Sequence, residues 1–140
     1  MFNVRVISSG CKPVQSHPTD AGYDVFSTID KTIEPGEKCK IPLGFATSFE
    51  PGYVAMLCNR SGLSTKHDLI LANCNGIIDP DYRGEWIAVL RNVGTVPYTI
   101  HKGDRVAQVL FMPVVLPKLN TVGWLESSER DDGGFGSSGL

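Results

Sequence analysis

The chain has 140 residues, with 15 glycines, nine prolines, four cysteines and a formal net charge of −2. A chain of this length builds one domain around one core and leaves no room for a second domain. The nearly balanced charge gives no global attraction to nucleic acid or to an anionic membrane, so any anion site must be local. We therefore expect one small domain with no direct nucleic-acid partner and no membrane partner.

The cysteines and histidines indicate neither disulfides nor structural zinc. The four cysteines lie far apart with no CxxC pair, and the three histidines form no zinc-type pair. The N-terminal residues lack the apolar region of a signal peptide, and the longest uncharged apolar run, 106–117, is too short to cross a bilayer. We expect a soluble intracellular protein, cytoplasmic, with a nuclear or organellar location also compatible.

The hydrophobic pattern has a period of two along most of the chain. Phe2, Val4 and Val6 alternate with polar residues, which predicts a half-buried strand at the N-terminus. Three later segments are apolar on both faces, which predicts strands covered on both sides by a second sheet or by another subunit. They are 53–59, 86–90 and 105–112. Only 61–69 predicts a helix, of one or two turns, so we expect an all-β fold, a jelly-roll-like sandwich or barrel.

The last fourteen residues differ from the rest in composition. Residues 127–140 contain four glycines and four serines and could not bury a core of their own. A frayed terminus is the simplest interpretation, although an arginine, a glycine pair and the single aromatic Phe135 also suit a strap over a phosphorylated ring. We expect residues 1–126 to form the β domain and residues 127–140 a flexible, glycine-rich tail.

Two polar segments lie in the middle of the chain. The segment RSGLS (60–64) suits an anion site made of a guanidinium, a hydroxyl and free helix amides, although a helix cap formed by Ser61 explains it equally well. The segment NCNGIIDPDYRGE (73–85) contains two turn-forming sequences, so a β-hairpin with two bends is its simplest interpretation. Its carboxylates, Asp79 and Asp81, are also the best candidates for activating a water molecule.

Two further segments flank these in the sequence. DAGYD (20–24) carries two carboxylates around a glycine, which suits Mg²⁺ beside a phosphate site, although a solvated turn is the alternative. GDRVAQ (103–108) places Gln108 inside an apolar strand. A buried glutamine must find hydrogen-bond partners, either from the core backbone or from a ligand.

Together the segments DAGYD, RSGLS, NGIIDPDYRG, GDRVAQ and RDDGGFGSSG resemble, in order and spacing, the five motifs of the trimeric dUTP pyrophosphatases (dUTPases). The resemblance covers residues 20–140. It implies a β jelly roll that assembles as a homotrimer, with three chains contributing to each active site. It also implies Mg²⁺-dependent hydrolysis of dUTP to dUMP and pyrophosphate, which limits uracil incorporation into DNA and supplies dUMP for dTMP synthesis.

The resemblance assigns the catalytic and phosphate-binding roles. Asp79 falls where the family has the base that deprotonates the water attacking the α-phosphorus, and Asp24 falls where the family holds Mg²⁺ through water. The γ-phosphate clamp corresponds to Arg130, after which Asp131 and Asp132 stand where the family more often has at most one acid. The other expected phosphate-binding residues are Arg60, Ser61, Gly62, Gln108, Gly136 and Ser137.

The resemblance also assigns recognition of the nucleoside. Asn73 and the backbone near Gly76 and Ile87 are expected to read the uracil edge. Tyr82 is expected to pack under the deoxyribose and exclude a 2′-hydroxyl, while Phe135 stacks on uracil. Cytosine would leave site groups unpaired, which can discriminate by roughly 10⁴.

Three alternatives explain less of the sequence. The dCTP deaminases resemble dUTPases in fold and assembly but carry a catalytic glutamate where this sequence has Val89. A non-catalytic binding protein on the same scaffold would be expected to lose Asp79, Asp24 or Arg130, yet all three are present. A structural jelly roll explains the strands but not the five polar segments. A regulatory protein partner in addition to catalysis remains compatible with the sequence.

Overall fold

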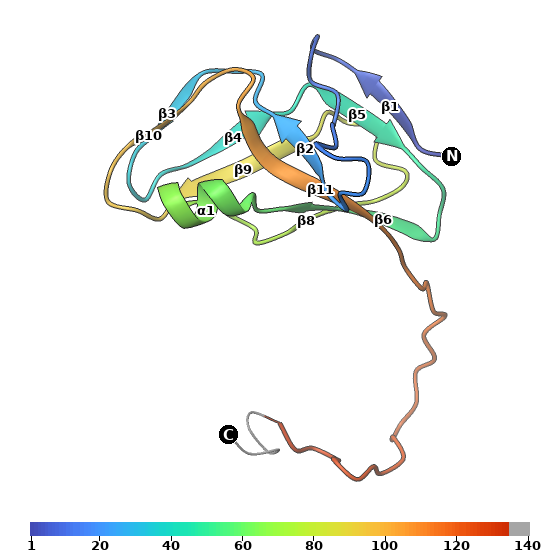
Figure 1. Cartoon of the computed structure of the whole chain (residues 1–140). Helices are drawn as coiled ribbons and strands as arrows, with labels where there is room; N and C mark the ends of the chain where they lie inside the picture. The colour runs from blue at the N-terminus through green and yellow to red at the C-terminus, as the bar shows by residue number, and fades with distance from the viewer. Residues whose placement is uncertain (135–140) are drawn as a thin grey trace.

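A computed structural model describes residues 1–134, and β-strands form most of its regular structure (Figure 1). Within this range there is one helix, α1 (Ser61–His67), at the position that the sequence predicts. The strands are β1 (Asn3–Val6), β2 (Tyr23–Phe26), β3 (Lys31–Ile33), β4 (Lys38–Pro42), β5 (Phe45–Ser48), β6 (Tyr53–Cys58), β7 (Leu69–Leu71), β8 (Gly76–Ile78), β9 (Ile87–Asn92), β10 (Tyr98–Ile100) and β11 (Arg105–Pro113).

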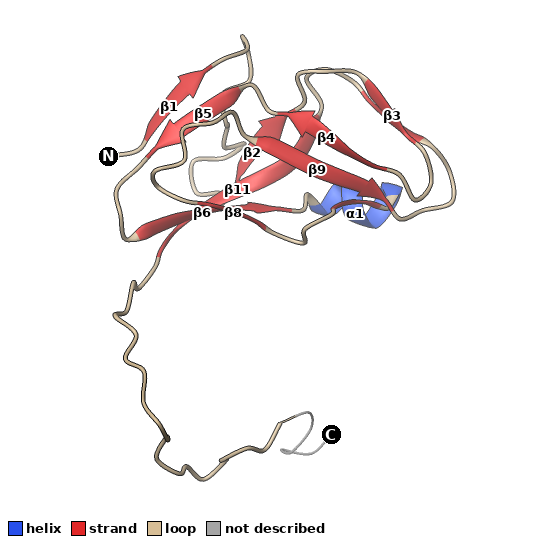
Figure 2. Ribbon diagram, turned by 180° about the vertical axis from the view of Figure 1, so that it is seen from behind, coloured by secondary structure: helices blue, strands red, loops and turns tan. Residues whose placement is uncertain are grey.

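Two antiparallel sheets enclose the core. One has the strand order β2–β11–β6–β8 and the other β4–β9–β7, while β1–β5 and β3–β10 form separate two-stranded sheets. Figure 1 shows β2 and β11 in front of β4 and β9, and Figure 2 shows the same layers from behind. One buried hydrophobic cluster, which includes Phe45, Trp86 and Leu90, draws on both sheets. The arrangement is a jelly-roll-like β-sandwich and confirms the predicted fold class.

The N-terminal strand differs from its prediction. β1 pairs with β5 in an antiparallel register, so the predicted strand is present. Its side chains are exposed on both faces, however, with Val4 and Val6 41% and 45% exposed. The prediction of a half-buried strand is wrong for the single chain because the β1–β5 sheet has only two strands and lies at the edge of the body. Phe2, just before β1, packs its ring against those of Phe49 and Phe111.

The three apolar strands are fully buried on only one of their two faces. Along β9, for example, Ala88 and Leu90 are buried, whereas Ile87, the first residue of the strand, is 43% exposed. β6 and β11 show similar mixtures of buried and half-buried positions. The sequence predicted that both faces of these strands are covered. Within the single chain, one face is covered and the other is partly exposed.

The segment 73–85 does not form the simple hairpin predicted from its turn residues. β7 pairs with β9, so the two strands that flank the segment are antiparallel neighbours. The segment between them leaves this sheet, and β8 pairs with β6 in the opposite sheet. The alternative of a plain hairpin is wrong because the three apolar residues of β8 complete the edge of the larger sheet.

The chain leaves the body after β11. The last backbone contact to the body is donated by the amide of Val114 to the carbonyl of Gly52, at 2.8 Å. From there to residue 134 the chain runs away from the sandwich (Figure 1). We name residues 114–126 the arm. Its exposed hydrophobic side chains are Val115, Leu116, Leu119, Val122, Trp124 and Leu125.

The described part of the chain has no helix long and apolar enough to cross a membrane. Its four cysteines, Cys11, Cys39, Cys58 and Cys74, are all free thiols.

Candidate active site

Asp24 is the centre of a charged cluster at the β2–β11 pair. Its carboxylate Oδ1 accepts a hydrogen bond from Nε of Arg60 at 3.2 Å, and Oδ2 lies 3.4 Å from Nη1 of Arg105. Gln108 lies directly opposite Asp24 in the strand register. The Asp24 side chain is only 16% exposed, so the two guanidinium groups compensate a carboxylate that is largely withdrawn from water.

The start of α1 positions the predicted phosphate-binding motif. Arg60 is the N-cap residue, with extended backbone and no side-chain cap, and its carbonyl accepts from the amides of Leu63 and Ser64. The alternative that Ser61 caps the helix is wrong, since Ser61 is already the first helical residue. The amides of Ser61 and Gly62 come too early in the helix to find an acceptor within it. This leaves two amides and a hydroxyl beside the Arg60 guanidinium.

Gln108 is held between two backbone segments. Its Nε2 donates to the carbonyl of Asn59 at 2.9 Å, which ties it to the residue before Arg60. Its Oε1 approaches Gly22 so closely that a Cβ atom at Gly22 would lie 2.6 Å away. Asp20, Gly22, Asp24 and Gln108 line one open hollow of about 360 Å³. Three of the predicted motifs thus meet at the β2–β11 edge.

The donors around this hollow fit Mg²⁺ bound through water. The described residues contain no group of three His, Cys, Asp or Glu side chains that could hold a metal directly. Mg²⁺ retains most of its waters and needs only one or two carboxylates beside substrate phosphates. Asp24 and Asp20 supply two carboxylates to the hollow, and the oxygens of Asp24 keep lone pairs beyond the two arginine contacts.

Asp79 lies on a different hollow. It follows β8, is exposed, and its backbone carbonyl accepts from the amide of Tyr82 at 3.2 Å. The Tyr82 hydroxyl donates to the carbonyl of Glu85 at 3.1 Å, which folds the ring back over Gly84. This hollow has a volume of about 230 Å³. Its lining residues are Ile77, Ile78, Asp79, Tyr82, Trp86 and Ile87.

Polar contacts to the body hold the loop after Asp79 in place. Arg83 donates from Nη1 to the carbonyl of Pro80 at 2.7 Å. Glu85 accepts from the amide of Gly44 at 2.9 Å, and the amide of Trp86 donates to the carbonyl of Phe45 at 2.9 Å. The loop is therefore tied at its far end to the β5 side of the sandwich.

Of the predicted uracil-reading residues, Ile87 lines the hollow of Asp79, whereas Asn73 and Gly76 lie at the other end of β8. Gly76 pairs with Leu57 of β6, and a Cβ atom at Gly76 would lie 3.1 Å from the Leu57 Cβ. The Asn73 side chain is beside it, with Nδ2 3.7 Å from that position. A side chain at this position would be tightly packed, because β8 approaches β6 closely.

Within one chain the predicted site residues form two separate groups. The Asp24, Arg60 and Gln108 group shares no lining residue with the Asp79, Tyr82 and Ile87 hollow. Arg130 belongs to neither group, because it lies on the extended C-terminal segment, and among residues 1–134 its side chain donates to the carbonyl of Gly133. The remaining predicted contacts, Phe135, Gly136 and Ser137, lie outside the described residues.

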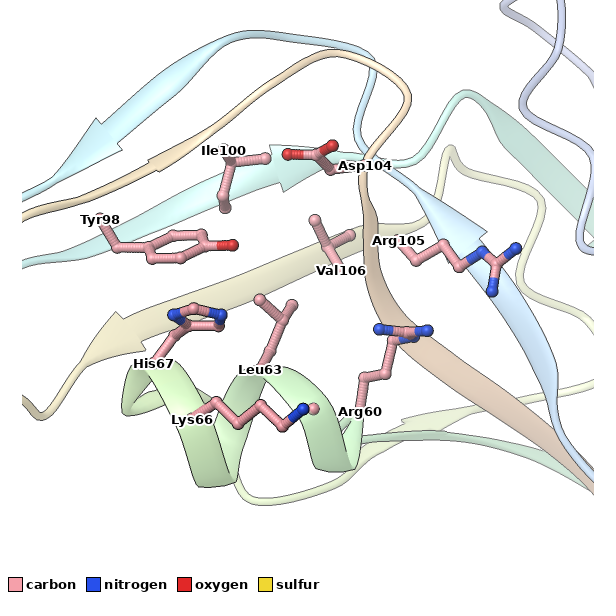
Figure 3. Close-up of a pocket in the computed structure, with 10 residues that line it drawn as sticks. Arg60, Leu63, Lys66, His67, Tyr98, Ile100, Asp104, Arg105 and Val106 are labelled. Atoms are coloured by element: carbon pink, nitrogen blue, oxygen red, sulfur yellow. The ribbon is translucent and has the colours of Figure 1, made fainter.

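The sequence interpretation missed the role of Arg105 and the hollow beside it. Figure 3 shows this hollow of about 370 Å³ between α1 and the β10–β11 region, with Arg60 and Arg105 at one end and Lys66 on the helix. Arg105 belongs to GDRVAQ, but nothing in that pattern says which way its side chain points. Tyr98 closes the other end, and burial raises the pKa of its hydroxyl, so it stays protonated at neutral pH.

A thiol also lies near the Asp24 cluster. Cys58 is opposite Gln108 on β6, and burial raises the pKa of its thiol. The thiolate, not the thiol, is the nucleophile in cysteine chemistry. The raised pKa therefore disfavours the reactive thiolate form of Cys58.

Comparison with known proteins gives one family. The family model described as dUTPase matches residues 10–139. The deoxyuridine 5′-triphosphate nucleotidohydrolase of Tolumonas auensis is 42% identical to the chain, covering 99% of this chain and 94% of that protein. The protein of the same name from Gloeobacter violaceus is 43% identical, covering 91% and 88%.

Solved structures agree with the sequence matches. The dUTPase of Staphylococcus bacteriophage 80alpha with dUpNHpp superposes with a TM-score of 0.92 at 32% identity, covering 100% of this chain and 99% of that chain. A mutant dUTPase from phage phi11 of S. aureus, described for its structural Mg(II) ion, gives a TM-score of 0.84 at 31% identity, covering 91% and 99%. The matches thus extend over the sandwich and the motifs it carries.

Proposed function

The chain belongs to the dUTPase family, and from this premise we propose that it hydrolyses dUTP to dUMP and pyrophosphate. The observation that supports this most directly is the meeting of Asp24, Arg60 and Gln108 at the β2–β11 edge, from three segments far apart in the sequence. This cluster offers cations, amides and an amide side chain to a polyphosphate. The product dUMP would serve dTMP synthesis, and removal of dUTP would limit uracil incorporation into DNA.

Asp79 acts as the base in this proposal. Its exposed carboxylate takes a proton from water, whose oxygen then bonds to the α-phosphorus. The bond from the α-phosphorus to the bridging oxygen breaks, and pyrophosphate leaves with the electron pair. A carboxylate within hydrogen-bond reach of the attacking water can accept this proton.

The phosphate side stabilises the charge on the triphosphate. Arg60 donates from its guanidinium, while Ser61 and Gly62 donate from the start of α1. Gln108 lies near the α-phosphate and the attacking water. Mg²⁺ on the triphosphate would neutralise part of its negative charge, and Asp24 is the residue that would hold it through water.

The Asp79 side of the site selects the nucleoside. Asn73 and the backbone at Gly76 and Ile87 read the uracil edge, and Tyr82 packs under the deoxyribose. Asn73 lies beside Gly76, and the hydrogen bond from Tyr82 to Glu85 holds the Tyr82 ring over Gly84 before substrate binds. A ring fixed in this way leaves little space for a 2′-hydroxyl.

We propose that a homotrimer brings the two sides together. The hydrophobic side chains of the arm are largely exposed in the single chain, with Leu119 and Leu125 87% and 85% exposed. Apolar patches of this kind mark association surfaces. One chain would supply Arg60 and Gln108, a second Asp79, and a third the tail with Arg130, Phe135, Gly136 and Ser137. Sedimentation should then give three times the 15.2 kDa mass of the chain.

The free thiols support an intracellular location. Reduced cysteines are typical of compartments that keep thiols reduced. We include a cytoplasmic location in the proposal on this ground.

A substrate panel tests the reaction. The purified protein with Mg²⁺ should release pyrophosphate from dUTP, and hardly at all from dCTP, dTTP or UTP. Comparable turnover of dCTP, or release of ammonia, would contradict the proposal and favour deaminase chemistry.

A further inference from the structure

The pairing of β11 with β2 contains an irregularity beside the active site. Gln108 lies directly opposite Asp24, but the register shifts between Arg105 and Ala107, so Val106 is an extra residue on β11. Val106 and Ala107 are both buried although they are consecutive, whereas a regular strand alternates. These are the properties of a β-bulge, which re-aims side chains near active sites.

The bulge decides where Arg105 points. In a regular strand, residues three positions apart, such as Arg105 and Gln108, lie on opposite faces. The extra residue returns Arg105 to the face that carries Asp24. Its Nη1 then lies 3.4 Å from Oδ2 of Asp24, and Figure 3 shows its guanidinium on the same side of the hollow as that of Arg60.

The two arginines use different oxygens of one carboxylate. Arg60 donates from Nε to Oδ1 at 3.2 Å, which leaves its two terminal nitrogens for another acceptor. Arg105 and the Ser16 hydroxyl occupy Oδ2. A carboxylate whose second oxygen still has a free lone pair can instead accept two parallel bonds from one guanidinium. With Arg105 absent, Asp24 could therefore take up a terminal nitrogen of Arg60 as well.

We propose that Arg105 is a positioning residue that holds Oδ2 of Asp24 and so keeps the terminal nitrogens of Arg60 available for substrate phosphate. The inference rests on the proposed function, because phosphate is the acceptor that Arg60 would serve. Arg105 acts through Asp24, and its own contact with the substrate is not required.

A double-mutant cycle with Asp24 tests this route. The affinity for dUpNHpp with Mg²⁺ is measured by calorimetry for the wild type, Arg105→Gln, Asp24→Asn and the double variant. Arg105→Gln should weaken binding about tenfold, which is the size expected for one interaction with a charged group. In the Asp24→Asn background the same substitution should have little further effect, because residues that act through each other are not additive. Full additivity would mean that Arg105 contacts the substrate directly and would overturn the inference.

Two further variants separate positioning from general stability. Arg105→Lys keeps a positive charge beside Oδ2 and should recover most of the lost affinity, whereas a lysine variant as weak as Arg105→Gln contradicts the proposal. Arg91→Gln, which removes an exposed arginine on β9, should bind like the wild type. Thermal unfolding shows whether each variant is folded. A wild type that neither binds dUpNHpp nor hydrolyses dUTP overturns the proposed function and this inference with it. Additive losses in an active enzyme overturn the inference alone.

Discussion

Asp24 and Asp79 are the two aspartates on which the proposed chemistry depends, and they differ in burial and in the contacts of their carboxylates. Asp24 is 16% exposed and has two guanidinium groups and a hydroxyl on its oxygens. Asp79 is exposed, and within residues 1–134 its carboxylate has no ion pair or hydrogen bond. The phosphate side is therefore assembled before substrate binds. The proposed base instead lies at the surface, and the groups that would complete its site are not supplied by residues 1–134 of the same chain.

The strongest way to test this contrast is to remove the charge of the exposed aspartate. Asp79→Asn should lower kcat by about 10² to 10⁴, the usual contribution of a general base. Binding of dUpNHpp should change little, because the phosphate side stays intact. Single-turnover pyrophosphate release and calorimetry measure the two effects separately.

Asp81→Asn is the matched control for this substitution. Asp81 is exposed on the same loop, two residues from Asp79, and removing its charge alters the loop's electrostatics by the same amount. It should keep activity near that of the wild type. Equal losses in both variants would mean that the loop's negative charge, and not the base at Asp79, limits the rate.

The tail is the next largest expected effect. Truncation after Glu129 removes Arg130 and the predicted contacts at 135–137, so pyrophosphate release should fall about 10- to 100-fold, as expected for lost charge-assisted hydrogen bonds. Among residues 1–134 the Arg130 side chain donates to Gly133 of its own segment, which lies away from the sandwich (Figure 1), so the unfolding midpoint should shift by no more than about 2 °C. Steady-state kinetics measures the loss of activity, and calorimetric melting measures the unfolding midpoint. Full activity in the truncated protein would contradict the tail assignment.

The sequence predicted the elements of the site better than their arrangement. The short helix after Arg60 and the strand around Gln108 follow from local pattern and turn residues, and both occur where expected. The bulge at Val106 leaves no local signal, because it arises from pairing with a strand eighty residues away. The orientation of Arg105 could therefore not be predicted.

Non-local pairing also explains the two errors in the fold. Alternation at Phe2, Val4 and Val6 predicts a strand correctly, but burial depends on a second layer that β1 does not have within the chain. Turn residues in 73–85 predict a reversal correctly, yet β8 joins β6 because the edge of the larger sheet is open to it. In both cases the sequence predicted the local conformation but not which strand or layer packs against it.

A smaller effect is expected from displacing the Tyr82 ring, which is proposed to pack under the deoxyribose. A Cβ atom at Gly84 would lie 2.6 Å from Cζ of Tyr82, so Gly84→Ala must displace the ring and break its bond to Glu85. We expect kcat/KM for dUTP to fall about tenfold and the preference over UTP to narrow, since a misplaced contact loses positioning. Arg91→Gln, at an exposed position on β9, is the control. An unchanged dUTP/UTP ratio in Gly84→Ala would refute the role of Tyr82.

The smallest expected effect tests how firmly the phosphate side is assembled. At Gly22 an added Cβ would lie 2.6 Å from Oε1 of Gln108, which is the far end of a flexible side chain and can turn aside. Gly22→Ala should therefore leave the unfolding midpoint nearly unchanged while kcat falls about three- to tenfold, because the Gln108 amide loses its fixed place beside Asp24. Thermal melting and steady-state kinetics, with Arg91→Gln again as the control, separate the two. If kcat is unchanged, then the Gln108 amide takes up its position only when substrate binds. Preorganisation of the phosphate side would then be limited to Asp24, Arg60 and Arg105. A large drop in stability with full activity would instead make Gly22 a packing residue with no part in holding Gln108.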